Sequence, residues 1–475
     1  MSKTLPPHLP RRDFLRRTGA ATLATLASPW GMDLTGLAEA AAATTSPADD
    51  YKALICIFLQ GGNDHGNTLI PVDADAHGVY TRVRGGLAVP SSALAGSRLH
   101  PLNGADLGGR ELALNPAWAD LVPMFDTDHR LAVLLNVGPL HRPTTLADFR
   151  AGVALPPKLF SHNDQQSVWQ SHGAEGSTVG WGGLIGDDAL VRNASSSLSC
   201  VNLSGNAVFM AGQQAGQFMV NRSGPEPLKA LEAGNMFGSQ ACVDAFRKLV
   251  TTQEPSVHRL AKEHSLIMQR AIETNSQLLQ RLAGVSQPVP RGATANPLAD
   301  QLNTAVRIMA AHRDLGSAGL RRQVFFVQLG GFDHHDNLST LHPKLLKQVA
   351  DALVQLDADL FQLGLRDQVT AFTASDFGRT LSSNGDGSDH GWGSHHVVWG
   401  GAVRGGRVYG NWPDVTDVDT GAHNIGQGRL LPTMSVDHLA LALAGWMGVT
   451  DPALLARIAP HAAAFSGVSP LAGLF

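Results

Sequence analysis

The chain has 475 residues, a formal net charge of −4, 20 histidines and three cysteines. It contains no long basic run, which argues against nucleic acid as a partner. Three cysteines give no disulfide framework and no iron–sulfur cluster, although a bridge between Cys200 and Cys242 is left open. No dinucleotide or haem motif supports an oxidoreductase, which makes that class the weakest functional hypothesis.

The N-terminal region has the features of an export signal. Residues 11–16 read RRDFLR, a twin-arginine pattern, and a modestly apolar stretch follows from Thr18 to Leu37. Residues 38–40 (AEA) offer a small-residue cleavage site. We predict that residues 1–42 are a signal peptide read by the Tat translocase. The mature protein is then expected in the periplasm or outside the cell, with no transmembrane anchor. A basic N-terminal helix that stays on the protein is the alternative.

The rest of the chain predicts one α/β domain over residues 52–470. Residues 53–59 and 131–137 are continuous apolar runs of strand length, typical of strands buried on both faces. Cys56 lies in the first run and is interpreted as a small apolar residue. Residues 72–120 are rich in Gly, Pro and Ala, and they predict loops and short helices over the sheet edge.

The segment from 226 to 314 is predicted to be mainly helical and to form an insertion or a cap. Apolar residues at helical spacing run from Ser256 to Leu282. A Pro-rich stretch from Gln287 to Pro297 interrupts the pattern, and Leu298 to Ala311 resumes it. Near the C-terminus, residues 435–448 predict a closing helix.

The clearest element pattern spans residues 323–373. A strand over 324–329 is followed by an amphipathic helix over 341–363 and a second strand over 369–373. A strand–helix–strand unit of this kind makes its two strands parallel, with a right-handed crossover. The expected fold class is therefore α/β, with a central, mostly parallel sheet flanked by helices.

Aspartates follow three of the predicted strands. Asp64 follows the first apolar run, and Asp333 and Asp376 follow the two strands of the strand–helix–strand unit. The carboxyl ends of parallel strands share one sheet edge, where ligand sites of open α/β folds form. If the first strand is also parallel, all three carboxylates lie on that edge and can serve as metal ligands. For Asp64, a turn that satisfies local backbone groups is an equal alternative.

Histidines extend the Asp333 motif. Residues 333–336 read DHHD, after a Gly-Gly turn. The alternation of a loop gives Asp333 and His335 the same direction and leaves His334 behind them. We therefore predict that Asp333 and His335 are metal ligands.

A second aspartate–histidine pair, Asp389 and His390, stands in a Gly-rich loop. Glycine there permits close backbone approach to an ion, and His390 is the best single ligand candidate. We include Asp389 in the predicted ligand set. His395 and His396 are expected to point one inward and one outward as the next strand begins.

Two further side chains have competing interpretations. Arg379 is either a clamp for an anionic substrate, since its planar fork matches phosphate or sulfate oxygens, or a partner of Asp376 that only fixes the loop. Ser161 is either a nucleophile at a helix N-terminus, where backbone N–H groups would help bind an anion, or a helix-capping serine.

With these residues assembled, the chain resembles the bacterial family called domain of unknown function 1501, which is often exported by the twin-arginine route. That family is similar to the alkaline phosphatase and sulfatase superfamily. The matching stretches are 58–64 (FLQGGND), 330–335 (GGFDHH), 375–380 (SDFGRT), 389–393 (DHGWG) and 403–410 (VRGGRVYG).

The resemblance implies two metal positions at the carboxyl edge of the sheet. It places Asp64 and Asp376 around one metal, and Asp333, His335 and His390 around the other. Ser161 would then stand near the position of the nucleophile. Paired metals of this kind polarise a phosphoryl or sulfuryl oxygen and stabilise the leaving oxygen.

Two functions follow from these observations. The first is an exported hydrolase of phosphate or sulfate esters that uses one or two divalent metal ions, with Zn, Mn or Ca as candidates. Its substrate would be a small anionic ester. The second is a non-catalytic exported protein with a retained metal site that binds a partner or a surface polymer. Phe377 motivates this second hypothesis, because catalytic members of the superfamily usually carry a histidine there.

Overall fold

The computed structural model describes residues 50–193, 196–232, 234, 236–251, 259–285, 295–315, 319–467 and 469–475. The predicted signal peptide and most of the Pro-rich stretch from Gln287 to Pro297 lie outside the described residues. Within the described ranges, no helix combines the length and apolar character needed to cross a membrane.

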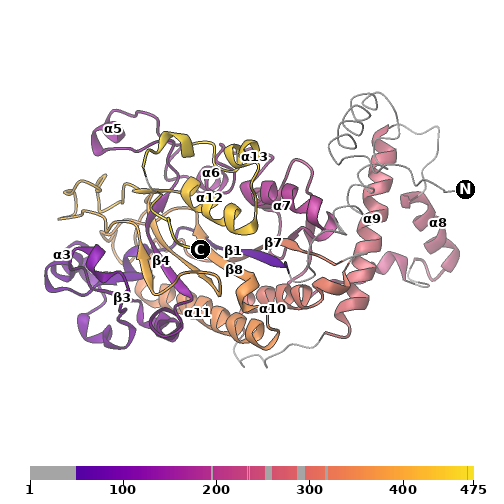
Figure 1. The fold of residues 1–475 in the computed structure, drawn as a ribbon, viewed down its shortest axis with the longest axis horizontal. Coiled ribbons are helices and arrows are strands. Elements are labelled where there is room, and N and C mark those ends of the chain that lie inside the picture. The colour runs from indigo at the N-terminus through magenta and orange to yellow at the C-terminus, as the bar shows by residue number, and fades with distance from the viewer. Residues whose placement is uncertain are drawn as a thin grey trace, which may run out of the picture.

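The core of the molecule is a mixed sheet of nine strands (Figure 1). Its order is β10-β4-β9-β8-β1-β7-β5-β6, with β11 paired to β4. Among these strands only β9 runs antiparallel to its neighbours, so the expected mostly parallel α/β sheet is confirmed. The strands are β1 (Lys52–Gln60), β4 (Leu131–Gly138), β5 (Cys200–Asn202), β6 (Gln217–Met219), β7 (Arg322–Gly330), β8 (Val369–Ser375), β9 (Ser394–Gly400), β10 (Arg407–Tyr409) and β11 (Met434–Ser435).

Helices cover both faces of the sheet, which explains the continuous apolar run of β1. Ala53, Ile55 and Ile57 face one hydrophobic cluster, whereas Leu54 and Cys56 face another. The first cluster contains α10 (Pro297–Ala310) and α11 (Leu338–Gln362), and the second contains α6 (His162–Ser171), α7 (Trp181–Arg192), α12 (Val436–Met447) and α13 (Pro452–Ile458). A strand between two helical layers has no polar side, so alternation is absent from its sequence.

The predicted strand–helix–strand unit is β7–α11–β8, and its two strands are parallel. They are not neighbours, because β1 lies between them and pairs with both. Residues Gln60, Gly330 and Ser375 thus end three parallel strands side by side, which places the segments that follow them on one edge of the sheet.

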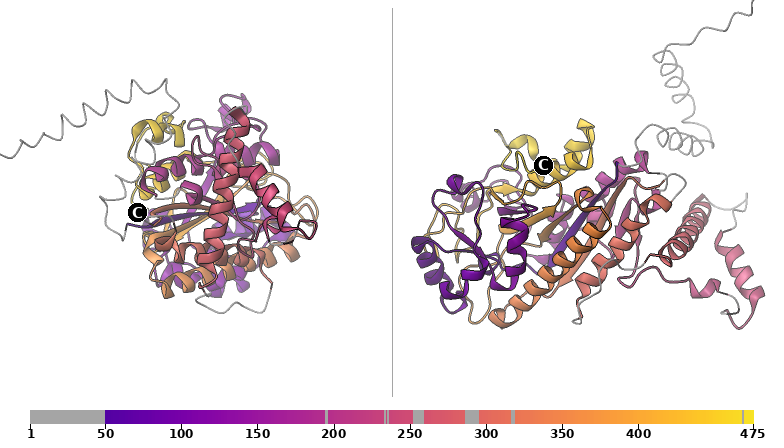
Figure 2. Two further views of the ribbon diagram at one scale, coloured as in Figure 1. Left: turned by 90° about the vertical axis from the view of Figure 1, so that its right-hand side faces the viewer. Right: turned by 60° about the horizontal axis from the view of Figure 1, so that its bottom comes forward.

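The segment from 226 to 314 divides into two parts. Helices α8 (Gln240–Thr251) and α9 (Arg259–Leu282) lie at one end of the molecule, beyond the sheet (Figures 1 and 2). Helix α10 instead packs on α11 and β7, inside the layer that covers the sheet. The resumption of the helical pattern after the Pro-rich stretch therefore marks a return to the α/β core.

The remaining elements surround the opposite end of the sheet. Residues 72–120 hold α3 (Ala74–Arg84) and several short 3-10 turns, and β2 (Leu69–Pro71) pairs antiparallel with β3 (Leu112–Leu114). Two short helices, α4 (Val122–Asp126) and α5 (Leu146–Arg150), follow. All three cysteines are free, so the Cys200–Cys242 bridge that the sequence left open does not form.

Candidate metal centre

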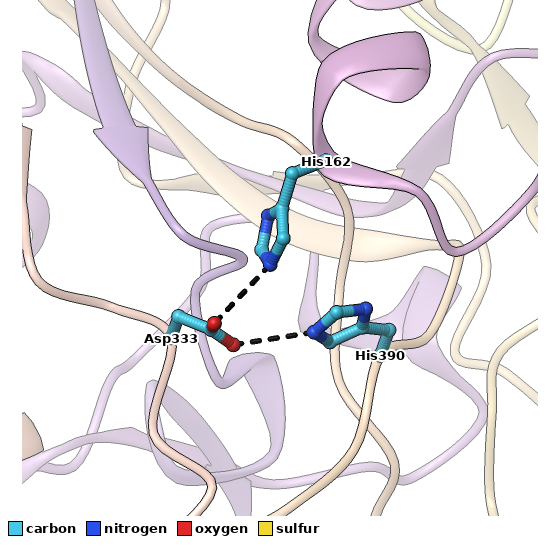
Figure 3. Close-up of side chains that lie close together, drawn as sticks. All are labelled: His162, Asp333 and His390. Atoms are coloured by element: carbon cyan, nitrogen blue, oxygen red, sulfur yellow. Dashed lines mark hydrogen bonds and ion pairs between the residues drawn. The ribbon is translucent and has the colours of Figure 1, made fainter.

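Four side chains converge beyond the carboxyl edge of the sheet. The Asp333 carboxylate lies 3.2 Å from His390 Nε2 and 3.3 Å from His162 Nε2 (Figure 3), and it lies 3.0 Å from His335 Nε2. The Nε2 atoms of His335 and His390 are themselves 3.0 Å apart. The Asp333 carboxylate therefore contacts three imidazoles, and the ligand atoms of His162, Asp333 and His390 all lie within 4.8 Å of one another.

Three different parts of the fold deliver these residues. His162 is the first residue of α6, Asp333 and His335 follow the end of β7, and His390 lies in the loop between β8 and β9. Because β9 runs antiparallel to β8, that loop stays on the same sheet edge. The structure thus brings together the predicted ligands Asp333, His335 and His390, and it adds His162.

Acceptors outside the cluster hold the Nδ1 atoms of His162 and His390, whereas His335 Nδ1 has only a carboxylate at the limit of hydrogen-bond range. His162 Nδ1 lies 2.6 Å from Asp376, His390 Nδ1 lies 2.7 Å from the carbonyl of Phe160, and His335 Nδ1 lies 3.4 Å from Asp389. Acceptors at Nδ1 fix the proton there and leave the lone pair on Nε2. The rings of His162 and His390 are consequently oriented as metal-ligating histidines are.

Two features of the cluster are unfavourable without a bound cation. His162 Nε2 is buried, and although Asp333 is near, it makes no hydrogen bond. The Nε2 atoms of His335 and His390 are 3.0 Å apart, and with its proton on Nδ1 the His390 ring directs its Nε2 lone pair into the cluster. A divalent ion among the four side chains would relieve both features, and three imidazoles with one carboxylate favour zinc over the oxygen-seeking calcium.

The electrostatics of the histidines agree with this reading. Burial lowers the pKa of His390, although the hydrogen bond to the Phe160 carbonyl opposes the shift. The hydrogen bond to Asp376 raises the pKa of His162 against the effect of burial. A neutral His390 keeps its lone pair available, and the carboxylate behind His162 makes that ring a more basic ligand.

Asp376 therefore stands behind the cluster rather than in it. The side chain is fully buried, and it accepts hydrogen bonds from His162 Nδ1, from Gln166 Nε2 at 2.9 Å and from the backbone N–H of Gly61 at 3.1 Å. These contacts leave its carboxylate oxygens occupied. Asp376 orients His162 and connects the loop after β1 to the loop after β8.

The predicted ligand Asp64 is not brought into the cluster either. Its carboxylate forms an ion pair with Arg84 at 2.5 Å, and both side chains are fully buried. Burial alone would raise the pKa of Asp64, but Arg84 and nearby groups outweigh it and lower the pKa. The guanidinium occupies the position of a cation partner, so the structure gives Asp64 an arginine where the sequence suggested a metal.

The turn after β1 explains why glycine precedes Asp64. Gly61 and Gly62 both have positive φ, at 115° and 82°. A Cβ atom on Gly61 would collide with the backbone of Asp333, and one on Gly62 would collide with the ring of Phe377. Glycine therefore permits the close approach of the three loops that meet at this edge.

Arg379 is buried and its donors are used within the protein. Its Nη1 donates to the Gly61 carbonyl at 2.9 Å and to Asp333 at 2.8 Å, and its Nε and Nη2 donate to Ser388. Of the two interpretations from the sequence, this geometry favours the one in which Arg379 fixes the loop. The partner expected from the sequence was wrong, because the ion pair forms with Asp333 and not with Asp376.

Ser161 occupies the N-cap position of α6, but its hydroxyl does not cap the helix. It donates instead to Asp164 at 2.7 Å, and this hydrogen bond lowers the pKa of Asp164. A carboxylate with a lowered pKa is a weak base for a hydroxyl. The histidine that follows, His162, is the residue of this motif that reaches the centre.

Several other histidines differ in their placement. His334 is buried beside His342, away from the cluster, as the loop alternation predicted. His395 and His396 lie on opposite faces of the sheet, but the expectation that one points outward is wrong, because both are buried. Their sides are covered by Trp412 and Trp169.

Two functional candidates were missed by sequence reasoning, His162 and Arg429. The only local signal for His162 was its place next to Ser161 at a predicted helix start. Arg429 lies 5.3 Å above the ring of Phe160, and its Nε donates to the backbone carbonyl of His390 at 2.6 Å. Phe160 itself has a positive φ of 74°, a strained conformation that aims its carbonyl at His390.

The sequence was compared with protein families, and residues 122–453 match the family described as "Protein of unknown function (DUF1501)". The chain belongs to this family. No curated protein matches the sequence.

Among solved structures, the DUF1501 chain is similar to a sulfatase, a periplasmic domain and a variant of an alkaline phosphatase. PsFucS1 sulfatase from Pseudoalteromonas sp. is 10% identical, with a TM-score of 0.33 and coverage of 88% of this chain and 72% of that chain. The C-terminal periplasmic domain of EcEptC from Escherichia coli, in complex with Zn, is 9% identical, with a TM-score of 0.32 and 88% coverage of both chains. A variant of alkaline phosphatase PafA is 12% identical, with a TM-score of 0.25 and coverage of 71% and 64%. All three TM-scores are below 0.5, so the fold assignment rests on the sheet itself.

Proposed function

We propose that this DUF1501 protein is an exported, metal-dependent hydrolase of phosphate or sulfate esters. The observation that carries the proposal is the gathering of His162, His335 and His390 around Asp333, with the Nδ1 atoms of His162 and His390 held by outer acceptors. A divalent ion bound there would supply Lewis acidity toward a phosphoryl or sulfuryl oxygen.

The residues of the chain hold this centre in a fixed geometry. Asp376 orients His162, the Phe160 carbonyl orients His390, and Arg379 ties Asp333 to the loop after β1. Preorganised ligands need little rearrangement when an ion or a substrate binds. The exposure of Asp333, at 42% of its side chain, leaves the centre open to an ester from solution.

Arg429 is the side chain best placed to receive an anionic substrate. It is half-buried, it lies over Phe160, and its Nε is fixed on the carbonyl of His390. Within the described part of the chain, neither Nη atom of Arg429 makes a hydrogen bond or an ion pair. Two free guanidinium donors beside the centre suit the oxygens of a phosphate or sulfate group. We assign Arg429 the clamping role that the sequence suggested for Arg379.

The cellular location is part of the proposal. Residues 1–42 carry the twin-arginine pattern, and we propose that the Tat translocase exports the folded protein to the periplasm or beyond. Substitution of Arg11 and Arg12 by lysine should trap the unprocessed chain in the cytoplasm. Export of that variant at the normal rate would contradict this assignment, which fractionation and immunoblotting can show.

The first experiment measures metal content by elemental analysis on protein purified without chelator. An Asp333→Ala, His390→Ala double variant should lose the metal of this centre, whereas His264→Ala, an exposed histidine on α9, should keep it. If the double variant retained as much metal as wild type, the proposed centre would be ruled out.

The second experiment tests hydrolysis. Metal-loaded protein is assayed with an aryl phosphate, a phosphodiester and an aryl sulfate, beside the double variant and Ser161→Ala. Cleavage that disappears in the double variant supports the hydrolase, and unchanged activity in Ser161→Ala removes Ser161 as nucleophile. A folded, metal-loaded protein that cleaves none of the three esters would instead support a non-catalytic protein that binds a surface polymer.

A further inference from the structure

A second group of potential metal ligands lies away from the centre described above. His172, Asp437 and His461 each offer one ligand atom, and these atoms all lie within 4.8 Å of one another. His172 Nδ1 is 3.4 Å from Asp437 Oδ2, and His461 Nδ1 is 3.7 Å from Asp437 Oδ1. Both separations are too long for good hydrogen bonds, although they suit groups that share an ion.

Three elements from distant parts of the sequence build this group. His172 is the C-cap residue of α6 in a left-handed conformation, with φ of 59°. Asp437 lies in the first turn of α12, and His461 follows α13. The side chains are only 5%, 1% and 25% exposed, respectively.

The hydrogen bonds inside the group are incomplete. Asp437 is well held, because it accepts from the His461 backbone N–H at 2.8 Å and from the Ser435 hydroxyl at 2.9 Å. By contrast, His172 Nε2 and His461 Nδ1 are buried nitrogens without a hydrogen-bond partner. A buried nitrogen without a hydrogen-bond partner is costly unless another group satisfies it, and His461 Nδ1 is such a nitrogen that also faces the fixed Asp437 carboxylate.

We propose that His172, Asp437 and His461 form a second site for a divalent transition metal, best suited to zinc, with His141 as a neighbour that supports the ring of His461. The ring of His141 stacks on that of His461 with centroids 4.3 Å apart. Two imidazoles and a carboxylate are donors that zinc accepts, and a water molecule can complete a four-coordinate site. The inference does not depend on the proposed hydrolase activity.

The surroundings favour the ligand forms of these residues. The His172 side chain is only 5% exposed, and burial of this kind disfavours a positive charge on the ring. His172 also caps the C-terminal end of α6, where the helix dipole favours positive charge. A cation at this point therefore meets neutral nitrogens, one carboxylate and the negative end of a helix.

The location gives the second site a structural task. Helix α6 carries His162 at its first turn and is followed by His172, so the ten residues from His162 to Ser171 separate the two sites by about 15 Å. An ion held by His172 fixes the far end of the helix that presents His162. Binding at the second site should therefore stabilise the protein without contacting substrate.

Zinc titration of the full chain tests the proposal against the first centre. Wild-type protein should bind about two equivalents of zinc, the Asp333→Ala, His390→Ala variant about one, and that variant with His461→Ala added about none. His461 is chosen because its partial exposure favours folding of the variant. His172→Asn is the second substitution, since asparagine tolerates the left-handed backbone, and His264→Ala is the matched control.

Cobalt provides a readout that needs no activity. In the Asp333→Ala, His390→Ala background, Co²⁺ should give the visible absorption of a four-coordinate site, and His461→Ala and His172→Asn should each abolish it. His141→Ala, which removes the ring stacked on His461, should weaken binding by about tenfold. Circular dichroism shows whether each variant is folded. One equivalent that persists in folded variants of both His461 and His172, or none in the background itself, would overturn the proposal while leaving the first centre intact.

Discussion

Two carboxylates at the same sheet edge are neutralised in opposite ways. Asp64, after β1, is completely buried and paired with the buried guanidinium of Arg84. Asp333, after the neighbouring strand β7, is 42% exposed and surrounded by imidazoles. A strand-end aspartate thus becomes a candidate ligand or an ion-pair partner according to what the rest of the fold places beside it, and position at the edge does not decide between them.

The largest expected effect comes from breaking the buried ion pair between Asp64 and Arg84. Arg84→Met removes the cation from a buried ion pair and leaves the Asp64 carboxylate uncompensated. We expect a loss of about 3–5 kcal/mol in the free energy of unfolding, because an unpaired buried charge is strongly unfavourable. Denaturant unfolding of wild type and variant measures the difference.

Two further variants test the cause of the stability loss in Arg84→Met. Asp64→Asn combined with Arg84→Met should recover part of the lost stability, since no buried charge remains. Asp333→Asn should change the free energy of unfolding much less, because its carboxylate is partly exposed, and should lower metal content instead. Equal destabilisation by Arg84→Met and Asp333→Asn would contradict the difference proposed between the buried Asp64 and the partly exposed Asp333.

The second largest effect is expected from acidification, which should lower the stability of the buried region around Asp64. Burial lowers the pKa of His65 and of His342 to about 4, although Asp64 opposes the shift in both. In the unfolded chain these groups titrate near pH 6.5, so between pH 6.5 and 4 the unfolded state binds more protons. Stability is therefore full above pH 6.5 and falls as the pH drops to 4, by on the order of 3 kcal/mol per group.

Unfolding midpoints at pH 7, 6 and 5 test this dependence. The Asp333→Ala, His390→Ala background in the presence of chelator removes the contribution of bound metal. His342→Gln should make the pH dependence shallower there, whereas His264→Gln, on the surface of α9, should not. A slope unaffected by His342→Gln would mean that His342 is not held neutral in the folded state.

The contrast between the two carboxylates also shows what sequence reasoning reached. The strand–helix–strand unit and the run of β1 were predictable because hydrophobic period and element length are local properties. From them followed the common edge of Asp64, Asp333 and Asp376. The partners were not predictable, because Arg84 and His162 come from helices whose docking on the sheet leaves no trace at those positions.

A weaker effect is expected from the residue that orients His162. Asp376→Asn keeps the shape of the side chain but removes the charge that raises the pKa of His162. Loss of such an outer carboxylate should weaken metal binding by about 10–100-fold, with the number of bound ions unchanged at saturation. Competition with a chromophoric chelator measures the affinity. If Asp376 were itself a ligand, the variant would lose bound metal even at saturation.

The smallest effect is expected at Arg429, beside the partly exposed centre around Asp333. Arg429→Gln removes the guanidinium beside His390 but leaves the four proposed ligands in place. If the protein hydrolyses an anionic ester, KM should rise by about tenfold, in line with one lost charge-assisted hydrogen bond, while metal content stays the same. Arg379→Gln is the matched comparison, because that guanidinium is buried and bonded to Asp333 and Ser388. It should reduce stability and metal affinity together, since it holds the loops and not the substrate. If KM in fully metal-loaded enzyme rose more for Arg379→Gln than for Arg429→Gln, Arg379 would be the residue that binds the anionic substrate. Arg429 would then only support His390.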